Sequence, residues 1–454
     1  MQARLIQIWQ ALGGDGSRAG AVGIGGAGRL ASLYDVTGLA AGSIGAAGLA
    51  LAEAMEAVLD QTPALTVDAR LASFWFSTAL APQGWEPPPL WDAIAGDYRS
   101  ADGWIRLHTN APHHRRAAQG VLGAHDTRAA MAAAVARWAA TDLEQAVVSA
   151  GGCAAEMRAE ADWRAHPAGI AVAAEPLAAQ EMFSGDCRGW SARRDRPLAG
   201  LRVLDLTRVL AGPVATRFLA GYGAEVQRID PASWNEPGVE PEMTLGKRCA
   251  RLDLRQPQDR DRLLALLAGA DVLVHGYRSD ALERLGLGAA ARRAARPDLI
   301  DVSLDAYGFS GPWAGRRGFD SLVQMSCGIA EAGMRWAGAD KPVPLPCQAL
   351  DHATGYLMAA AALRGLARRA RQGGGTTARL SLARTAALLT GWGAQAAGDA
   401  PAPKSAADLA PAIEATHWGP ARRLMPPLAV SGAPMRWDIP ARALGWADAA
   451  WVGA

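Results

Sequence analysis

The chain has 454 residues, half of them hydrophobic and 20% charged, which allows two or three globular domains. A formal net charge of +2 gives no electrostatic reason to expect nucleic acid or an acidic membrane as a partner. The five cysteines are scattered without a C-x-x-C pair, which indicates reduced thiols and not a disulfide framework or a zinc site. We therefore expect a soluble, cytoplasmic protein without a metal.

The first ninety residues are expected to be mainly helical. Residues 31–60 are rich in Ala and Gly, which favours a helix in close contact with another helix or with a sheet. Residues 65–81 begin with strand-like alternation and change to helical spacing. The apolar run at 38–54 consists of small residues and is interrupted, so it is more typical of a packed helix than of a membrane span.

Residues 91–175 are expected to form a small α+β domain. The segment 97–110 contains two short strand patterns joined at Ala101-Asp102-Gly103, which is a hairpin signal. Helical spacing follows at 127–150 and 154–165. The next segment, 176–196, is polar and irregular, and we predict a linker there.

After residue 197 strand and helix patterns alternate. Strands are expected at 201–207, 224–230, 271–277 and 297–308, with helices at 212–223, 259–270 and 279–287, the last capped by Ser279. This alternation predicts a doubly wound, mainly parallel α/β sheet, a Rossmann-like large domain, over 197–398, with 399–454 as a tail packed on it. Ligands of such sheets bind at the carboxyl ends of the strands, which indicates the loops at 207–213, 231–241, 276–279 and 307–318.

A short phrase occurs twice, as "LYDVTG" at 33–38 and as "LDHATG" at 350–355. Residues 37–52 also align with 354–369, so we interpret 1–90 as a partial, degenerate repeat of helices from the catalytic half. The acid is displaced by one position between the copies. One residue rotates a helical side chain by about 100°, so Asp35 is expected to point away from the direction of Asp351. We expect this degenerate first copy to be scaffold.

Several long, ordered motifs carry a resemblance to a known family. They are "PLAGLRVLDLTRVLAGPVATRFLAGYGAEVQRIDP" (197–231), "GKRCARLDL" (246–254), "GFDSLVQ" (318–324) and "PLPCQALDHATGYL" (344–357). Over residues 197–395 the chain resembles the family III CoA-transferases, the CaiB/BaiF type that includes the formyl-CoA and carnitine CoA-transferases. Residues 97–124 resemble the small domain of that family, which normally follows the catalytic half. The arrangement is that of a fused, partly deleted duplication.

The resemblance implies a CoA-transferase that moves CoA from an acyl-CoA donor to a small carboxylic acid. Asp351 matches the family nucleophile, which forms an aspartyl anhydride and then an aspartyl-CoA thioester. Coenzyme A, bound as substrate, is the only cofactor implied, and a homodimer is the implied assembly. The residues that match CoA contacts are those of the loop over the thioester, Val209, Leu210 and Ala211, and the positions Lys247, Arg248, Tyr277 and Arg278.

Other interpretations of the same residues remain open. Asp351 would also suit the N-cap of a helix. It could act as the base of an acyl-CoA isomerase or lyase, and the deletions are consistent with a non-catalytic CoA-binding partner protein. Racemases related to this family need a histidine where "GFD" has Phe319, and phenylalanine cannot move a proton, which argues against two-base racemisation. His108, His113 and His114 are expected on the surface of the small domain, because no carboxylate or cysteine stands at ligand spacing.

Overall fold

The first half of the chain builds two groups of elements. The computed structural model describes residues 1–277, 280–396 and 398–453. The N-terminal elements are α1 (Gln2–Ala11), α2 (Gly16–Gly20), β1 (Gly23–Gly25), α3 (Val36–Leu59), β2 (Leu65–Asp68), α4 (Ala69–Trp75) and β3 (Leu80–Pro82). The small domain follows with β4 (Gly96–Arg99), β5 (Trp104–Leu107), α5 (Pro112–Leu122), α6 (Arg128–Val135), α7 (Ala140–Ser149) and β6 (Ala154–Glu156).

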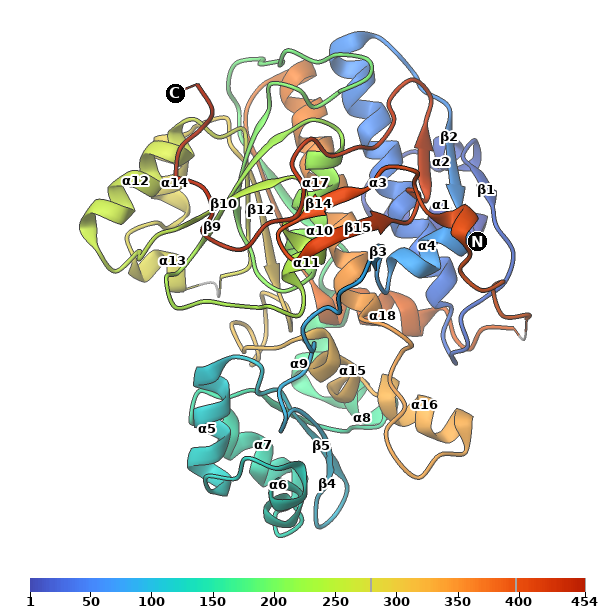
Figure 1. Cartoon of the computed structure of the whole chain (residues 1–454), viewed down its shortest axis with the longest axis vertical. Coiled ribbons are helices and arrows are strands. Elements are labelled where there is room, and N and C mark those ends of the chain that lie inside the picture. The colour runs from blue at the N-terminus through green and yellow to red at the C-terminus, as the bar shows by residue number, and fades with distance from the viewer. Residues whose placement is uncertain (278–279, 397, 454) are drawn as a thin grey trace.

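The small domain is an antiparallel sheet in the order β4-β5-β6, covered by α5 to α7. The predicted hairpin at 97–110 is confirmed, since β4 pairs with β5. In Figure 1 this domain lies below the large sheet. Two short helices, α8 (Glu160–Ala165) and α9 (Pro167–Ala174), then lead back to the large domain.

The large domain alternates strands and helices. Its elements are β8 (Arg202–Leu206), α10 (Ala211–Gly221), β9 (Glu225–Asp230), α11 (Glu240–Met243), β10 (Lys247–Arg251), α12 (Pro257–Ala268), β11 (Val272–His275), α13 (Ala281–Arg284), α14 (Ala289–Ala295), β12 (Ile300–Asp305), α15 (Asp320–Ser326), α16 (Ile329–Ala337), α17 (Ala349–Gln372), β13 (Thr376–Ser381) and α18 (Leu382–Gly391). The helix expected at 279–287 is shorter, and its predicted cap Ser279 lies outside the described residues.

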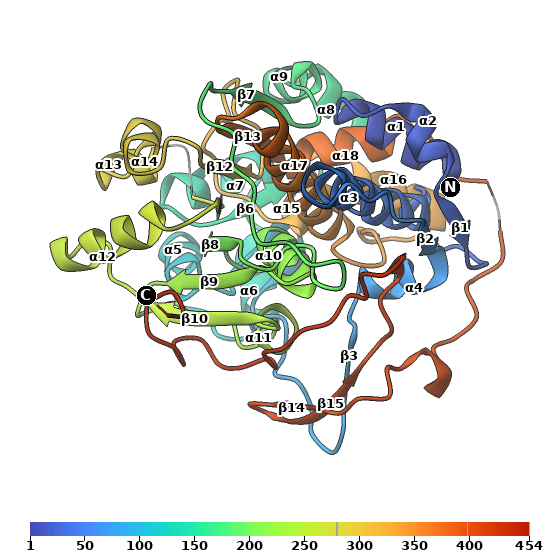
Figure 2. The ribbon, with the colours of Figure 1, turned by 90° about the horizontal axis from the view of Figure 1, so that it is seen from above.

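The large sheet has the order β10-β9-β8-β11-β12-β13-β7, and all pairs are parallel except that of β13 with β7. The predicted doubly wound α/β fold is therefore confirmed, with a reversal of strand order between β8 and β11. Alternate residues of β8 face opposite sides: Val203 packs with α10 and α17, and Leu204 with α12. Figure 2 shows α12 to α14 on one side of the sheet and α10 and α17 on the other.

The predicted linker and the predicted tail both contain strands, and the tail also packs on the large domain, as Trp451 does against α12. The predicted linker 176–196 contains the strand β7 (Ala179–Met182), which extends the large sheet through β13. The tail forms η1 (Ala406–Asp408), β14 (Glu414–Thr416), β15 (Gly419–Arg423) and β16 (Leu428–Val430). Of these, β16 pairs with β2, and β15 pairs with β3, so the tail is tied to the N-terminal region by strands.

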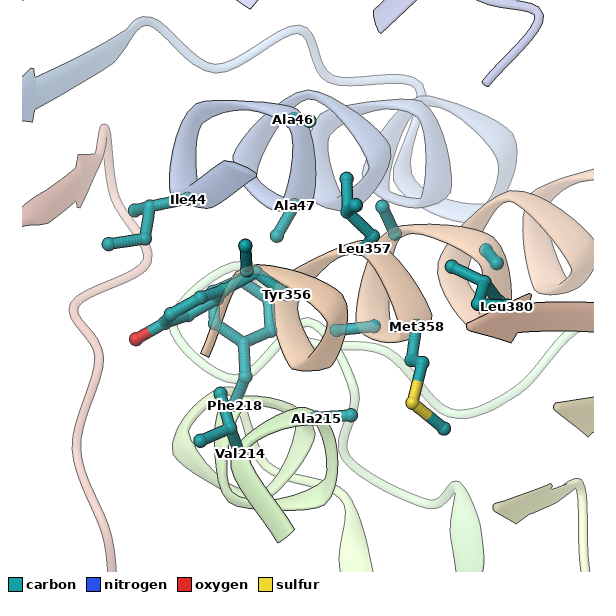
Figure 3. Packing of buried hydrophobic residues seen from close by; sticks show 14 of the residues in the cluster. Ile44, Ala46, Ala47, Val214, Ala215, Phe218, Tyr356, Leu357, Met358 and Leu380 are labelled. Carbon is teal, nitrogen blue, oxygen red and sulfur yellow. The ribbon is translucent and has the colours of Figure 1, made fainter. Parts of the chain in front are cut away.

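The repeated phrases start two long helices, α3 and α17, that pack against each other in the core. Figure 3 shows Ala47 of α3 on the side that faces Leu357 of α17, with Phe218 of α10 on the opposite side of α17. Small side chains allow this close packing. By length and composition α3 would suffice to cross a membrane, but 94% of its most apolar stretch is buried inside the protein. The predicted packed helix at 31–60 corresponds to α3.

Candidate active site

Asp351 lies in the first turn of α17 and does not cap it. The N-cap position belongs to Gln348, and the helix begins at Ala349. The Asp351 side chain accepts no hydrogen bond from the described part of the chain, although the residue is only 8% exposed. The N-cap interpretation of Asp351 is therefore not what the structure shows. A buried carboxylate without a partner is costly and indicates a functional group.

The acid of the first copy has the structural role that Asp351 lacks. Asp35 is the N-cap of α3, and its Oδ1 accepts the Gly38 N–H at 2.9 Å. Arg4 also contacts the carboxylate, at 3.3 Å. In the position equivalent to Asp351 stands Tyr34, whose hydroxyl donates to Glu160 at 3.2 Å. The first copy thus uses its acid to begin a helix, as expected of scaffold.

The glycines of the two phrases, Gly38 and Gly355, also have different structural roles. A Cβ at Gly38 would lie 2.4 Å from Asp35 Oδ2, so Gly38 makes room for the cap. A Cβ at Gly355 would lie 2.4 Å from the carbonyl oxygen of Ala211. Gly355 therefore lets the start of α10, and the loop before it, approach α17 one turn after Asp351.

The residue that fixes the start of α17 is Asp320, the first residue of α15. Its Oδ2 accepts the backbone N–H groups of Leu350 at 2.8 Å and of Asp351 at 2.9 Å. Gln324 donates to the other oxygen and accepts the Leu345 N–H at 2.7 Å. Sequence reasoning missed Asp320, because the "GFD" phrase drew attention to the position of Phe319. The acid that follows it was the available signal.

Burial sets the ionisation of this pair of acids. It raises the pKa of Asp351 well above the usual range, and the neighbouring Asp320 carboxylate raises it further. Burial also raises the pKa of Asp320 to about 6, against the opposing effect of the backbone N–H groups that it accepts. The two carboxyl groups therefore hold protons at a higher pH than exposed aspartates do.

A cavity of about 340 Å³ opens at the carboxyl ends of β8, β11 and β12, and Asp351 is part of its wall. Three arginines, Arg208, Arg316 and Arg317, line it. Arg208 lies over the rings of Trp234 and Tyr277, at 4.8 Å and 5.1 Å from their centres, and donates to the Tyr277 hydroxyl at 3.0 Å. Cationic and aromatic groups at the strand ends suit a phosphorylated ligand with a heterocycle.

A second cavity, of about 210 Å³, meets the first at Asp351. Val209 and Phe319 also belong to both walls. Much of the second wall comes from residues 77–91 of the N-terminal region and from 238–243 of the large domain. Asp351 is therefore accessible from two cavities that differ in lining.

The loop between β8 and α10 brings a strained residue to the junction of the cavities. Val209 has φ of 64°, in the left-handed region, which is unusual for a β-branched residue. Its N–H donates to Glu236 Oε2 at 2.9 Å. Leu210 lines the second cavity, and Ala211, which begins α10, lines the first. All three loop residues singled out from the sequence therefore border the two cavities.

The comparison with protein families finds a match for the segment that contains Asp351. Residues 198–416 match the model described as CoA-transferase family III. Over these residues, slightly less than half of its length, the chain is similar to CoA-transferase family III. The family is enzymatic, and the match includes Asp351 and the strand-end loops of the first cavity.

Curated relatives match the chain only in part. A probable fatty acyl-CoA transferase of Mycobacterium tuberculosis is 36% identical over 195 residues, 39% of this chain and 48% of that protein. The succinyl-CoA:glutarate CoA-transferase of Mus musculus is 34% identical over 195 residues, 40% of this chain and 44% of that protein. The chain thus spans about half the length of these relatives.

Solved structures give similar partial matches. A hypothetical protein from Mycobacterium tuberculosis matches with 32% identity and a TM-score of 0.39, over 43% of this chain and 57% of that one. A CAIB/BAIF family protein from Brucella suis matches with 24% identity and a TM-score of 0.38, over 50% and 65%.

Four further residues were expected from the resemblance to contact CoA, and they lie in different surroundings. Tyr277 lines the first cavity, as described above, and Arg278 lies outside the described residues. Lys247 is a correction: its ammonium is fully buried and contacts Asp205 Oδ2 and the Pro213 carbonyl, both at 3.0 Å. Arg248 lies near Trp446, 5.6 Å from its ring centre, and borders neither cavity. Both residues begin β10, at the amino ends of the strands, opposite the end where the first cavity opens.

Of the three histidines expected on the surface of the small domain, His113 is exposed, whereas His108 and His114 are buried against Phe319. His108 is 5% exposed and stacks on Phe319, with ring centres 3.6 Å apart, and His113 and His114 line the first cavity. Burial lowers the pKa of His108 and of His114 to about 3, so both are neutral at pH 7. Among the described residues no group of three or more His, Cys, Asp or Glu is placed to hold a metal ion.

Proposed function

We propose that this protein transfers CoA from an acyl-CoA donor to a carboxylic acid, with Asp351 as the nucleophile. The observation that carries the proposal is the position of Asp351 where the two cavities meet. Its carboxylate accepts no hydrogen bond from the described residues. The family of the matched segment and the names of the relatives, which include CoA-transferases for succinate and glutarate, support the same reaction class.

The proposed first half-reaction forms a covalent intermediate. An Asp351 oxygen attacks the thioester carbonyl, the C–S bond breaks, and a mixed anhydride and CoA thiolate result. The thiolate then attacks Cγ of Asp351, which expels the donor acid as a carboxylate and leaves an aspartyl-CoA thioester. Burial supports these steps, since a poorly solvated carboxylate held against the carbonyl is a better nucleophile than a hydrated one.

The second half-reaction reverses the first with a new acid. The acceptor carboxylate attacks Cγ of the aspartyl thioester, which gives a second anhydride and releases the thiolate. The thiolate attacks the acceptor carbonyl, forms the new acyl-CoA and frees the Asp351 carboxylate. Charge is balanced at each step, because one anion, either a carboxylate or the CoA thiolate, attacks for each anion that leaves.

In this proposal CoA occupies the first cavity. Arg208, Arg316 and Arg317 would contact phosphate groups, and the Trp234 and Tyr277 rings would contact the adenine. The thioester end would then reach Asp351, beneath the loop that holds Val209. The acyl group would extend toward the second cavity.

Covalent trapping tests the proposal. The protein is incubated with acyl-CoA and then with hydroxylamine or borohydride, and the modified peptide is identified by mass spectrometry. We expect modification at Asp351, and none in Asp351→Asn. The matched control is Asp35→Asn, the same change in the first copy, which should be labelled like the wild type. A folded protein that is not labelled at Asp351 would contradict the proposal.

One observation favours a second candidate reaction. A carboxyl group with a raised pKa is suited to accept a proton, so Asp351 could instead be the base of an acyl-CoA isomerase or lyase. This reaction exchanges the α-proton of an acyl-CoA with deuterium from the solvent in the absence of any acceptor acid. Deuterium exchange without covalent labelling would favour it over transfer.

We also propose that the protein acts in the cytoplasm as a homodimer. The homodimer is the assembly that the family resemblance implies. Within one chain α3 already covers α17, so the dimer interface is not needed to bury that helix. Sedimentation velocity of the purified protein tests the assembly, with twice the chain mass as the expected result. Fractionation of the cells that contain the protein tests the compartment.

A further inference from the structure

The second cavity has a mainly apolar lining that the proposed reaction does not by itself require. Apolar side chains come from both halves of the chain: Leu80, Leu90 and Trp91 from one, Val239 and Met243 from the other. Pro87 and Pro88 precede Leu90 in the wall, and proline restricts the backbone there. A hydrocarbon group in this cavity would be removed from water, at a gain of about 0.8 kcal/mol for each buried CH₂.

The polar groups of this cavity are acids or are neutral. Asp351, Asp320 and Glu242 supply carboxylates, and no lysine or arginine is among the described residues that line it. His108, which also lines it, is neutral at pH 7 because burial lowers its pKa to about 3. The first cavity, by contrast, has three arginines.

Two cations behind the cavity wall are held by acids. Arg217 and Arg423 both pair with Glu242, the latter at 3.1 Å. Arg423 also pairs with Glu414 at 2.7 Å. Glu242 also accepts hydrogen bonds from the Thr78 hydroxyl at 3.2 Å and from the N–H groups of Ala79 at 3.4 Å and Leu80 at 3.1 Å. A carboxylate that entered the cavity would meet no lysine or arginine among the described residues of its lining.

We propose that the second cavity binds the acyl group, and that this group is an uncharged, largely apolar chain and not a dicarboxylate. This inference rests on the proposed function, since it assigns the substrate class of the same site. A second carboxylate on the acyl group would lose its hydration near Asp320, and no lysine or arginine of the described lining would compensate that loss. The same preference applies to the acceptor acid, because donor and acceptor occupy the site in turn.

A matched pair of donors tests the inference. Hexanoyl-CoA and adipoyl-CoA have acyl groups of equal length that differ in a terminal carboxylate. We expect kcat/KM for transfer to be at least about tenfold higher with hexanoyl-CoA, because the terminal carboxylate must be desolvated without a cation. Equal or higher kcat/KM with adipoyl-CoA would overturn the inference and leave the proposed function intact. Absence of both transfer and labelling of Asp351 would overturn the proposed function itself.

A charge-introducing variant adds a second test. Leu90 is 54% exposed at the cavity wall, so Leu90→Arg is expected to fold and to place a cation within reach of the terminal carboxylate. We expect the ratio of hexanoyl-CoA to adipoyl-CoA activity to fall by about tenfold, as for one added ion pair. The control is Ile413→Arg, at a residue 64% exposed and outside the cavity, which should leave the ratio unchanged. An unchanged ratio in Leu90→Arg would contradict the placement of the acyl group.

Discussion

The Asp320 carboxylate accepts the backbone N–H of Asp351 at 2.9 Å, so one buried acid fixes the position of another. This contact joins the start of α15 to the first turn of α17. It holds the backbone of Asp351 while leaving its side chain free to face the cavities. It also brings two like charges together, and that has consequences for the pH dependence of the reaction.

Transfer is expected to be lost in acid at a higher pH than an exposed aspartate would give. Asp351 must be ionised to attack a thioester, and both burial and Asp320 raise its pKa. The rate therefore falls as the pH drops through that raised pKa, and is fully present above it. In Asp320→Asn the like charge is removed, so the acid limb of kcat/KM should move to lower pH. A profile that does not move would show that the charge of Asp320 has no influence on Asp351.

The stability of the protein should depend on the same acids in the opposite sense. The pKa of Asp320 is raised to about 6 in the folded state, above its value in the unfolded chain. Its contribution to stability is therefore fully present below the unfolded pKa and is lost as the pH rises through about 6. Urea denaturation between pH 4 and 8 should show this loss in the wild type and a smaller one in Asp320→Asn. An equal dependence of the free energy of unfolding on pH in the two proteins would contradict this prediction.

Arg208→Ala is expected to weaken CoA binding. The guanidinium lies between Trp234 and Tyr277 in the first cavity, and a lost charge-assisted contact costs about 1.5–3 kcal/mol. Isothermal titration with CoA should show about a tenfold or greater loss of affinity. The matched control is Arg255→Ala, since Arg255 is exposed and pairs only with Asp253 among the described residues. Equal affinity in both variants would place CoA elsewhere.

Lys247→Met is expected to lower stability without lowering the affinity of the folded protein for CoA. The change leaves the carboxylate of Asp205 buried without its cation, which costs about 3–5 kcal/mol. Thermal denaturation measures the loss. Lys341→Met, at an exposed position, is the control and should change the free energy of unfolding by less than about 0.5 kcal/mol. A stable Lys247→Met with weak CoA binding would restore the role expected from the sequence.

Val209→Gly should relieve backbone strain and slow transfer. The valine holds a left-handed conformation that glycine adopts freely, so the folded state gains about 1 kcal/mol. The loop that borders both cavities then loses its fixed geometry, and we expect kcat to fall more than CoA affinity. Val148→Gly, at a helical residue of α7 outside both cavities, is the comparison and should only destabilise. A Val209→Gly protein that is less stable than the wild type would argue against stored strain.

The sequence predicted the sheet and the position of the central acid because both have local signals. Runs such as 201–207 and 297–308 alternate with helices at regular spacing, and each became a strand of one parallel sheet. The shift of one residue between the two hexamers predicted that Asp351 and Asp35 have different roles. The structure then showed how the shift acts: Asp35 precedes its helix, and Asp351 lies inside the first turn.

Other features had no local signal. Lys247 and Arg248 are adjacent basic residues, and only the packing of β10 shows that the first points into the core. Asp320 contacts backbone N–H groups 30 and 31 residues further along, which no pattern of side chains reveals. The pairing of β2 with β16 joins short segments far apart in the chain. Such contacts depend on the whole fold.

The strands that tie the tail to the N-terminal region also govern how the chain is made. On the ribosome β2 emerges long before its partner β16 has been translated, because the two strands lie far apart in the chain. At about 5–20 residues per second this delay is on the order of tens of seconds. For most of that time the apolar α3 lacks α17, so nascent chains should recruit chaperones until α17 has been translated.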